Sequence, residues 1–558
     1  MSQAESTQRL DEALAVVRHY HENTKHAFDR YARGPETIDW SAQPDPFRSY
    51  QGAARIQLPM PETENPLGYN AMFQASGVEA AAFNLEAISR LLRLSLGLSA
   101  WKEYQGSRWS LRCNPSSGNL HPTEAYLISL DVSGLPNGVH HYNSHDHALQ
   151  QRSQFVDAMA VPDAARPGQP LLLLALTSVT WREAWKYGER AYRYCQLDTG
   201  HALAAIRYAA ALLGWEIALL TQWGDDDIAM LTGSDRQQDF AGAESETPEL
   251  LFCIKPHAAA TPLLAENPDA LLALTDSGNW TGQANVLDAK HLYDWPIIDE
   301  VIQATAKPRV PTTQHAAAHF PAPIPCDSPY TAQLLIERRR SAQAYDGQTA
   351  IEKQQFFRIL DMLLPRADTP PWDALPWPAS THLLLFVHRV RDVNPGLYLL
   401  ARTTDAVAAL KQALLPDKFD WTSVEDCPEH IPLYHLLDAN CQKASATLSC
   451  HQRIASDGVF SLCMLAEFDA SLADGAWRYR QLYWEAGCIG QVLYLEAEAI
   501  DLQGTGIGCY FDNAVHDMLG LKSSRFQAMY HFTVGGAYND PRLRTLPAYH
   551  AIDRSEDG

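Results

Sequence analysis

The sequence lacks several patterns that would assign it to common classes of protein. None of its 10 cysteines forms a Cys-x-x-Cys pair or a cysteine–histidine cluster at zinc-ligand spacing, which favours a reduced, intracellular chain without a metal site. No apolar run approaches the roughly 20 residues that span a bilayer. The first residues also lack the basic and apolar segments of a signal peptide. We therefore expect a cytoplasmic protein with no membrane partner.

Positive charge is also scarce. The chain has 44 Lys and Arg residues against 66 Asp and Glu residues, a formal net charge of −22. A nucleic-acid-binding protein relies on a basic surface, so this balance excludes nucleic acid as a partner. With 558 residues, of which 46% are hydrophobic and 20% charged, the chain is typical of a globular protein with more than one domain.

A proline-rich segment near the middle of the chain predicts a domain boundary. Six prolines stand between Thr305 and Pro329, a density that few helices or central strands tolerate. Leu10, Leu14 and Val17 recur at helical spacing and predict an N-terminal amphipathic helix. We therefore expect four parts, which are an N-terminal helical extension (1–55), a first domain (56–304), a linker (305–329) and a second domain (330–558).

Short strings recur in the two halves in the same order. AYRYCQL at 191–197 returns as AWRYRQL at 476–482, an offset of 285 residues (476 minus 191), and DDDIAMLTG at 225–233 matches DNAVHDMLG at 512–520. This indicates an internal duplication, with an insertion of roughly thirty residues placed around 420–444. Two similar halves in one chain predict a pseudo-dimer about an approximate two-fold axis.

The periodicity of the apolar residues predicts a mixture of helices and strands in each half. Residues 84–98, 199–219 and 486–502 have helical spacing, and PLLLLALTSV at 170–179 predicts a fully buried strand. Helices that cover a largely buried sheet give an α+β sandwich. HHYNSHDH at 140–147 predicts a surface hairpin and not a metal site, because no set of carboxylates accompanies it.

The segment RCNPSSGNLHP at 112–122 resembles the flavin-facing loop of nitroreductase-fold flavoproteins. It is most similar to the SagB-type branch, the azoline dehydrogenases of ribosomal peptide maturation. ERRRSAQAYDG at 337–347 is similar to the family's phosphate loop, GTGIGCYFDNAVHDMLGL at 504–521 to the segment that passes the flavin ring, and DPRLR at 540–544 to its C-terminal basic pair. The resemblance implies two nitroreductase-like domains, fused in tandem as an intrachain pseudo-dimer.

The resemblance also implies FMN as the cofactor. Forked arginine donors suit a phosphate, and a flavoprotein must position its flavin and exclude water from it. Gln343 stands where the family usually has Arg or Lys, so one phosphate charge is missing. The residues assigned to FMN in this way are Pro115, Ser116, Ser117, Asn119, Arg339, Arg340, Ser341, Gln343, Ile507, Gly508, Cys509, Arg542 and Arg544.

The two halves have lost different parts of the family's pattern. The first half keeps the Pro-Ser-Ser-Gly-Asn loop and has no Arg-Arg-Ser, whereas the second half keeps Arg-Arg-Ser and has LPWPASTHLLLFVHRV (375–390) in place of a Pro-Ser-Ser-Gly-Asn loop. In the family, each flavin takes its phosphate site from one subunit and this loop from the other. The losses therefore predict one complete composite site. The second, symmetry-related site would lack both of its binding loops.

Lys186 and Tyr187 match the Lys-Tyr pair that helps to remove a proton in azoline dehydrogenases, since a desolvated lysine can act as a base. We therefore expect an FMN-dependent oxidoreductase that transfers hydride to or from flavin N5. Its substrate would be a small molecule or a peptide, azoline-type dehydrogenation is one form of the reaction, and NAD(P)H or O2 is the redox partner. Two alternatives stay open, which are a flavin-less binding or scaffold protein and a flavin-holding sensor.

Overall fold

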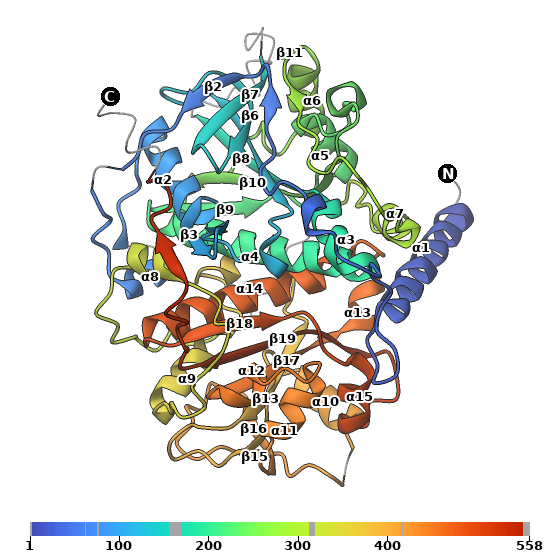
Figure 1. Cartoon of the computed structure of the whole chain (residues 1–558), viewed down its shortest axis with the longest axis vertical. Coiled ribbons are helices and arrows are strands. Elements are labelled where there is room, and N and C mark those ends of the chain that lie inside the picture. The colour runs from blue at the N-terminus through green and yellow to red at the C-terminus, as the bar shows by residue number, and fades with distance from the viewer. Residues whose placement is uncertain are drawn as a thin grey trace.

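The computed structural model describes residues 3–61, 63–74, 77–155, 170–311, 319–415 and 417–550. Each half contains one large antiparallel sheet, and two long helices, α4 (Ala191–Ala211) and α14 (Arg478–Ala499), lie side by side between these two sheets (Figure 1). Buried apolar residues of both halves form one continuous cluster around these helices. The arrangement is the α+β architecture that the apolar periodicity predicts.

The first sheet has the strand order β11-β7-β6-β5-β8-β10-β9, with β2 paired to β7. Its strands are β2 (Ala54–Gln57), β5 (Thr123–Leu130), β6 (Gly138–Asn143), β7 (Ala148–Gln154), β8 (Leu171–Ser178), β9 (Trp215–Leu219), β10 (Thr247–Pro256) and β11 (Asn279–Trp280). The helices of this half are α2 (Leu85–Ser95), α3 (Thr180–Tyr187), α4, α5 (Asp225–Thr232), α6 (Pro268–Asp276) and α7 (Pro296–Ala304). The strand predicted at 170–179 is β8, whose residues are all buried.

The second sheet has the strand order β15-β16-β14-β13-β17-β19-β18. Its strands are β13 (Thr381–Val387), β14 (Gly396–Leu400), β15 (Thr422–Ser423), β16 (Leu433–Asp438), β17 (Phe460–Glu467), β18 (Gln503–Ile507) and β19 (Phe526–Gly535). The helices of this half are α8 (Ala332–Arg338), α9 (Lys353–Met362), α10 (Ala406–Ala413), α11 (Gln442–Leu448), α12 (Ile454–Asp457), α13 (Phe468–Leu472), α14 and α15 (Asp512–Leu519).

The two sheets have the same order of corresponding strands. The run β7-β6-β5-β8-β10-β9 in the first sheet matches β16-β14-β13-β17-β19-β18 in the second. The repeated strings fall on corresponding elements, because one pair lies at the starts of α4 and α14 and the other on α5 and α15. The halves therefore share one topology.

Two details of the sequence interpretation need correction. The expected insertion is present, but it lies between β14 and β16, within 401–432, and includes α10; the later part of the segment expected to hold it, 420–444, contains β16, the counterpart of β7. The hairpin expected at 140–147 does form between β6 and β7, but His140, His141 and His147 are fully buried. The Nε2 atom of His141 donates a 2.9 Å hydrogen bond to the carboxylate of Glu124, which satisfies this polar side chain in the interior.

The two central helices approach each other closely through a pair of glycines. A Cβ atom on Gly200 would lie 2.2 Å from the carbonyl oxygen of Trp484, and one on Gly487 would lie 2.2 Å from that of Leu197. Any side chain there would force the helices apart. These reciprocal contacts pair Gly200 with Gly487 and Leu197 with Trp484, an offset of 287 residues (487 minus 200). The strings at 191–197 and 476–482 predict an offset of 285, so the sequence register of these helices is wrong by two residues.

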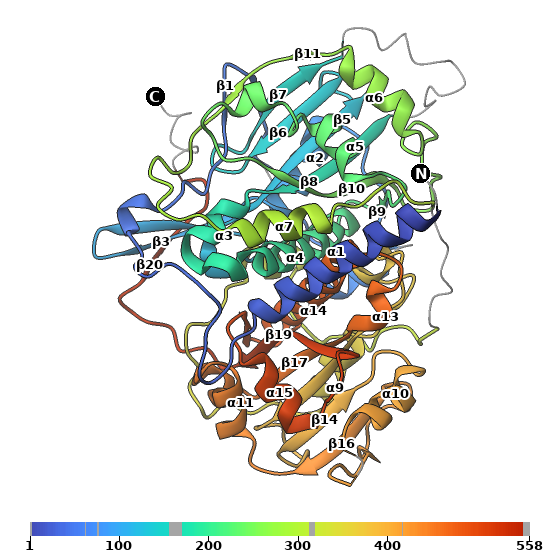
Figure 2. The same ribbon diagram turned by 90° about the vertical axis from the view of Figure 1, so that its right-hand side faces the viewer.

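Both ends of the chain bind the halves together. Helix α1 (Gln3–Asn23), the predicted N-terminal helix, crosses the junction, and Tyr20 contacts the rings of Tyr192 and Tyr479 (Figure 2). Near the other end, β20 (Arg544–Leu546) returns to the first half and pairs with β3 (Leu98–Tyr104), next to β4 (Ser107–Arg112). A short pair, β1 (Tyr50–Gln51) and β12 (Gln283–Ala284), completes the strands.

Across the described residues, we find no helix that combines the length and the apolar character needed to span a membrane.

Candidate functional site

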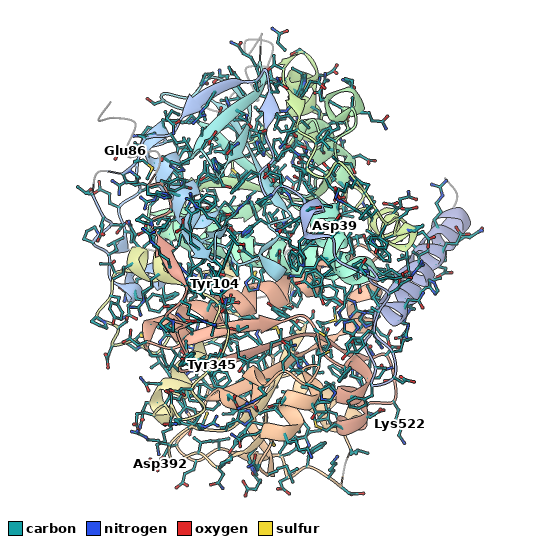
Figure 3. The ribbon with its side chains drawn as sticks, viewed as in Figure 1. Asp39, Glu86, Tyr104, Tyr345, Asp392 and Lys522 are labelled. Atoms are coloured by element: carbon teal, nitrogen blue, oxygen red, sulfur yellow. The ribbon has the colours of Figure 1, made fainter. Side chains whose placement is uncertain are left out.

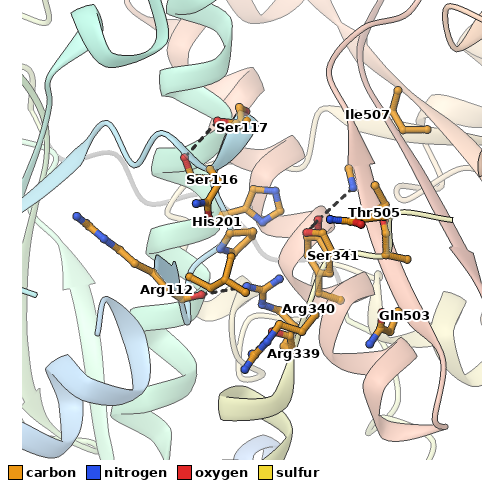
Figure 4. A pocket seen from close by; sticks show the side chains of 18 of the residues that line it. Arg112, Ser116, Ser117, His201, Arg339, Arg340, Ser341, Gln503, Thr505 and Ile507 are labelled. Atoms are coloured by element: carbon orange, nitrogen blue, oxygen red, sulfur yellow. Dashed lines mark hydrogen bonds between the residues drawn. The ribbon is translucent and has the colours of Figure 1, made fainter. Parts of the chain in front are cut away.

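A cleft of about 580 Å³ lies between the two halves, beside the central helices (Figure 4). This volume is in the range of small-molecule and cofactor sites. One wall comes from the first half, from the loop at 112–121 and from α3 and α4. The other wall comes from the second half, from the loop at 339–343 and the end of β18. Neither half alone encloses the cleft.

The loop of the first half is held by a buried carboxylate. The backbone N–H of Ser117 donates to both carboxylate oxygens of Asp198 on α4, at 3.0 and 3.1 Å, and its hydroxyl donates to Oδ1 at 3.0 Å. Asn119 donates to the carbonyl oxygen of Ser110 at 2.8 Å. The prolines and serines of 112–122 predict a rigid polar loop, and in the structure α4 anchors this loop through Asp198.

Gly118 brings this loop against Tyr187. Its φ is +58°, a left-handed conformation that favours glycine. A Cβ atom there would lie 2.4 Å from the phenolic oxygen of Tyr187. The sequence therefore needs glycine here both for the turn and for the tyrosine that packs on it.

The loop of the second half contacts the first half directly. Arg339 is buried, and its Nε and Nη2 donate to the carbonyl oxygens of Cys113 and Arg112 at 3.1 and 3.0 Å. Its Nη1 has no hydrogen-bond partner among the described residues. The hydroxyls of Ser341 and Tyr494 are 2.7 Å apart. Arg339 thus joins the two walls and keeps one donor nitrogen unused.

The sequence after this loop is anchored on the second sheet. The hydroxyl of Tyr345 donates to the carbonyl oxygens of Gln503 and Thr533, both at 2.9 Å, and its ring lies within the second half (Figure 3). The N–H of Ala342 donates to the carbonyl oxygen of Gly504 at 3.1 Å. These contacts fix the loop beside β18.

Cations gather on one side of the cleft, where Lys102, Arg112, Arg339 and Arg340 all contribute to its lining. Burial, together with the neighbouring Arg339, lowers the pKa of Arg340 to about 10. Burial also lowers the pKa of Lys102, with Arg340 adding to the effect. The mutual repulsion of these groups makes this side of the cleft suited to an anion.

Two buried acids lie under the loop of the first half. Burial raises the pKa of Asp198 to about 7, even though the hydrogen bonds from Ser116 and Ser117 act to lower it. Burial also raises the pKa of Glu183, and the charge of Asp198 raises it further. Both carboxylate oxygens of Glu183 lack a partner among the described residues that fulfils hydrogen-bond geometry. Strongly shifted groups in a cleft are typical of functional sites.

The cleft brings together most of the residues that the resemblance implies. The residues that line it are Pro115, Ser116, Ser117, Asn119, Tyr187, Arg339, Arg340, Ser341, Gln343, Ile507, Gly508 and Cys509. The carbonyl oxygen of Gly508 accepts from Arg190 at 3.0 Å and from Tyr194 at 3.2 Å, which fixes the turn after β18.

The structure places Lys186, Arg542 and Arg544 outside this lining. Lys186 and Tyr187 are neighbours in the last turn of α3, and only Tyr187 lines the cleft. Arg542 binds Asp540 at 2.6 Å on the surface. Arg544 lies on β20, where successive side chains point to opposite faces, and Thr545 is the one that lines the cleft.

Sequence reasoning missed several residues of the cleft. They are Lys102 from β3, Asp198 and His201 from α4, Tyr494 from α14 and Tyr530 from β19. Asp198 and His201 carried a signal, because two ionisable residues three positions apart lie on one face of a helix. Lys102 carried none, since its place depends on the pairing of β3 with β20. No group of three or more potential metal ligands occurs among the described residues.

Comparison with known proteins connects this architecture to one fold. No family model matches the chain. A crystal structure of a "putative nitroreductase" from Anabaena variabilis superimposes with a TM-score of 0.66, covering 94% of this chain and 99% of that one at 21% identity. The chain has a nitroreductase-like fold.

Two further proteins are similar to this chain. A "putative nitroreductase" of Methanocaldococcus jannaschii is 24% identical over 121 residues. The match covers 20% of this chain and 60% of that protein's length. A crystal structure of a "putative nitroreductase" from Ralstonia eutropha matches 38% of this chain and 96% of its own, with 14% identity and a TM-score of 0.27.

Proposed function

We propose that this chain is an FMN-dependent oxidoreductase with a single composite site in the cleft between its halves. The observation that carries the proposal is the meeting of two loops, 112–121 from the first half and 339–343 from the second, on opposite walls of one cleft. These are the loops whose sequences resemble the two sides of a nitroreductase-type flavin site. The tandem halves act as the two subunits of such a pseudo-dimer.

The residues of the cleft fit FMN. The unused Nη1 of Arg339, with Arg340, Lys102 and the Ser341 hydroxyl, would hold the phosphate, because charge-assisted donors suit this group. Lys102 supplies a charge that Gln343 does not. The loop at 115–119 and the turn at 507–509 would hold the ring system. When bound, the flavin supplies hydride transfer, while the protein supplies position, charge and a dry pocket.

The corresponding place in the pseudo-symmetric arrangement is filled by side chains. Glu485 on α14 corresponds to Asp198 on α4, and it accepts from the N–H of Ser380 at 2.9 Å as Asp198 does from Ser117. The guanidinium of Arg402, which is fully buried, pairs with Glu485 and lies 4.5 Å from the ring centroid of Trp372. This packing supports one flavin per chain.

Tyr187 is the side chain that we assign to substrate. It lines the cleft beside Gly118 of the loop at 112–121. Burial raises the pKa of its hydroxyl, which keeps that group protonated as a hydrogen-bond donor. Lys186 lies 5.2 Å from the Tyr187 ring centroid. Burial lowers the pKa of Lys186, with the charge of Glu183 opposing the effect. Lys186 acts through Tyr187 in this assignment.

The substrate is a small molecule or a peptide that exchanges hydride with the flavin, with NAD(P)H or O2 as the second redox partner. The loop at 112–122 resembles the flavin-facing loop of SagB-type enzymes, and this supports azoline-type dehydrogenation as the finer assignment. The cleft opens beside Tyr538, whose side chain is exposed at 62%, and an exposed aromatic ring at an opening offers a surface on which a substrate can pack.

The proposal is tested by anaerobic reduction of the FMN-loaded chain. We expect the visible absorbance of the flavin to bleach with NADH, NADPH or a thiazoline-containing peptide, and to return when O2 is admitted. Tyr187→Phe should retain FMN and slow this reduction about tenfold or more, while Tyr538→Phe should change it little. A chain that binds no FMN on reconstitution, or whose flavin none of these compounds reduces, would contradict the proposed function.

A further inference from the structure

Three segments that are far apart in the sequence meet at one edge of the cleft. The N–H of Phe511 donates to the carbonyl oxygen of Leu448 at 2.8 Å, and the N–H of Asp512 donates to that of His26 at 3.2 Å. The amide of Gln452 donates to the carbonyl oxygen of Cys509 at 3.1 Å. The N-terminal segment after α1, the turn after α11 and the turn after β18 are therefore held together.

Two cysteines lie next to each other at this junction. Cys450 stands between Leu448 and Gln452, which bond to the backbone of Phe511 and Cys509, and Cys509 also lines the cleft. Both are only partly buried. Cys450 has a φ of +53° and His451 a φ of +60°, left-handed conformations that are uncommon for residues other than glycine.

His26 completes a polar group around Cys509. The Nδ1 atom of His26 accepts from the N–H of Ala32 at 2.8 Å, which leaves Nε2 as the nitrogen that carries the proton in the neutral ring. The His26 side chain lies near Cys509 and acts to lower the pKa of that thiol. The guanidinium of Arg190 donates to the carbonyl oxygen of Gly508, the residue before Cys509, at 3.0 Å. Donors and positive charge thus surround this one sulfur.

This environment favours the thiolate of Cys509. The hydrogen bond from Cys450 is the largest effect, and it outweighs burial with the help of His26 and Arg190, so that the pKa of Cys509 falls to about 5. The same hydrogen bond raises the pKa of Cys450. One thiolate beside one protonated thiol is the arrangement from which a disulfide forms.

The remaining cysteines differ in environment. Seven of them are buried, and they are Cys113, Cys195, Cys253, Cys326, Cys441, Cys463 and Cys488. Cys427 is partly buried like the pair, but burial raises its pKa to about 12, which makes it a natural control. Buried thiols with raised pKa values are inert, so reactivity is concentrated at Cys450 and Cys509.

We propose that Cys450 and Cys509 form a redox-active dithiol that closes to a disulfide at the edge of the cleft and exchanges two electrons with the flavin there. When the S–S bond forms, the Cys509 thiolate and the Cys450 thiol together release two electrons and the Cys450 proton. These are equivalent to one hydride, which an oxidised flavin bound in the cleft would accept; the reverse transfer would reopen the disulfide. The electron exchange rests on the proposed function, whereas the disulfide does not.

Disulfide formation is tested first, without reference to the flavin. The purified chain is equilibrated with oxidised glutathione, its free thiols are alkylated, and its peptides are mapped by mass spectrometry. We expect a Cys450–Cys509 cross-link in the wild type and in Cys427→Ser, and none in Cys450→Ser. In Cys450→Ser the new hydroxyl can donate in place of the Cys450 thiol, so alkylation of Cys509 should still reach half its maximal rate below pH 7. Absence of the cross-link, or an alkylation midpoint near the ordinary thiol value of about 8.5, would overturn the proposal.

Electron exchange is tested by anaerobic titration of the oxidised, FMN-loaded chain with dithionite. The wild type and Cys427→Ser should consume four electrons per flavin, two for the flavin and two for the disulfide, and Cys450→Ser should consume two. Consumption of two electrons by wild-type chain whose disulfide has been mapped would overturn the exchange. A chain without flavin would overturn the proposed function and the exchange with it, while the peptide map would still decide the dithiol.

Discussion

Arg193 of α4 forms a 2.9 Å ion pair with Asp512, the first residue of α15, across the junction between the halves. The relationship occurs twice, because Arg480 of α14 binds Asp225, the first residue of α5, at 2.7 Å. The four residues occupy corresponding positions of the two halves. Such reciprocal contacts are typical of an isologous dimer interface, here made within one chain.

The Asp512 ion pair predicts a pH-dependent stability. Burial acts to raise the pKa of Asp512, but Arg190 and Arg193 lower it to about 2, below the unfolded value of about 3.9. The stabilisation is therefore complete above pH 4 and is lost as the pH falls toward 2, an effect of about 2 kcal/mol. Asp512→Asn should lower the free energy of unfolding by about 3 kcal/mol at pH 7.

Urea unfolding at pH 7 and at pH 3 checks this prediction. The difference between wild type and Asp512→Asn should shrink at the lower pH. Asp517→Asn, an exposed position on the same helix, should behave like wild type at both. An equal difference at the two pH values would refute the ion pair as its cause.

Gly118→Ala should impair the cleft beyond its effect on stability. The left-handed φ predicts a loss of about 1 kcal/mol in the free energy of unfolding, and the new Cβ would displace the Tyr187 hydroxyl. Gly106 also has a positive φ, with nothing within 4 Å of an added Cβ. Gly106→Ala should thus lower stability similarly and leave flavin reduction unchanged, whereas Gly118→Ala should slow it about tenfold. Equal rates in the two variants would argue against the Tyr187 contact.

Asp198 predicts the opposite pH dependence from Asp512. Its pKa is raised to about 7 by burial, so the folded chain holds a proton that the unfolded chain releases near pH 4. Its contribution to stability therefore decreases as the pH rises from about 4 to 7, by up to about 1.4 kcal/mol per pH unit. Asp198→Asn does not titrate, so between pH 5 and pH 8 it should gain stability relative to wild type.

Thermal or urea unfolding at the two pH values measures that gain. Asp226→Asn provides the comparison, because Asp226 is exposed at the start of α5 and should follow wild type. A gap between Asp198→Asn and wild type that does not change with pH would mean that Asp198 is not protonated in the folded chain at pH 5.

Arg339→Ala should weaken FMN binding about tenfold or more, because a charge-assisted hydrogen bond contributes about 1.5–3 kcal/mol. Arg339→Lys keeps the charge and loses the fork, so its loss should be smaller. Arg542→Ala should bind FMN like wild type, since Arg542 is engaged by Asp540 and does not itself line the cleft. Titration of the apo-protein with FMN, followed by fluorescence, distinguishes these variants. A greater loss in Arg542→Ala than in Arg339→Ala would reverse this assignment.

Local sequence was sufficient to predict the elements that place the cleft. The loop at 112–122 combines residues that favour turns, and the repeated strings at 191–197 and 476–482 lie at the starts of the two central helices. Apolar periodicity predicted those helices and the buried strand β8 because burial determines all three. Both patterns depend on residues close together in the chain.

Residues whose places depend on long-range pairing could not be found in this way. Lys102 reaches the cleft only because β20 pairs with β3, and Arg544 points away because Thr545 takes the inward position on that strand. Cys450 and Cys509 are brought together by three separate segments. The buried histidines of 140–147 were assigned to the surface because their polarity hid the contacts, such as that with Glu124, that satisfy them inside.

The central claim is that one flavin is held jointly by the two halves, and the ratio of FMN to chain tests it most directly. The purified chain, saturated with FMN and freed of excess, should release one FMN per chain on denaturation. Arg339→Ala should lose this FMN, and Arg402→Lys, at the filled counterpart of the cleft, should still release one. A ratio of two in the wild type, or a ratio of one that persists in Arg339→Ala at low FMN concentration, would contradict the account.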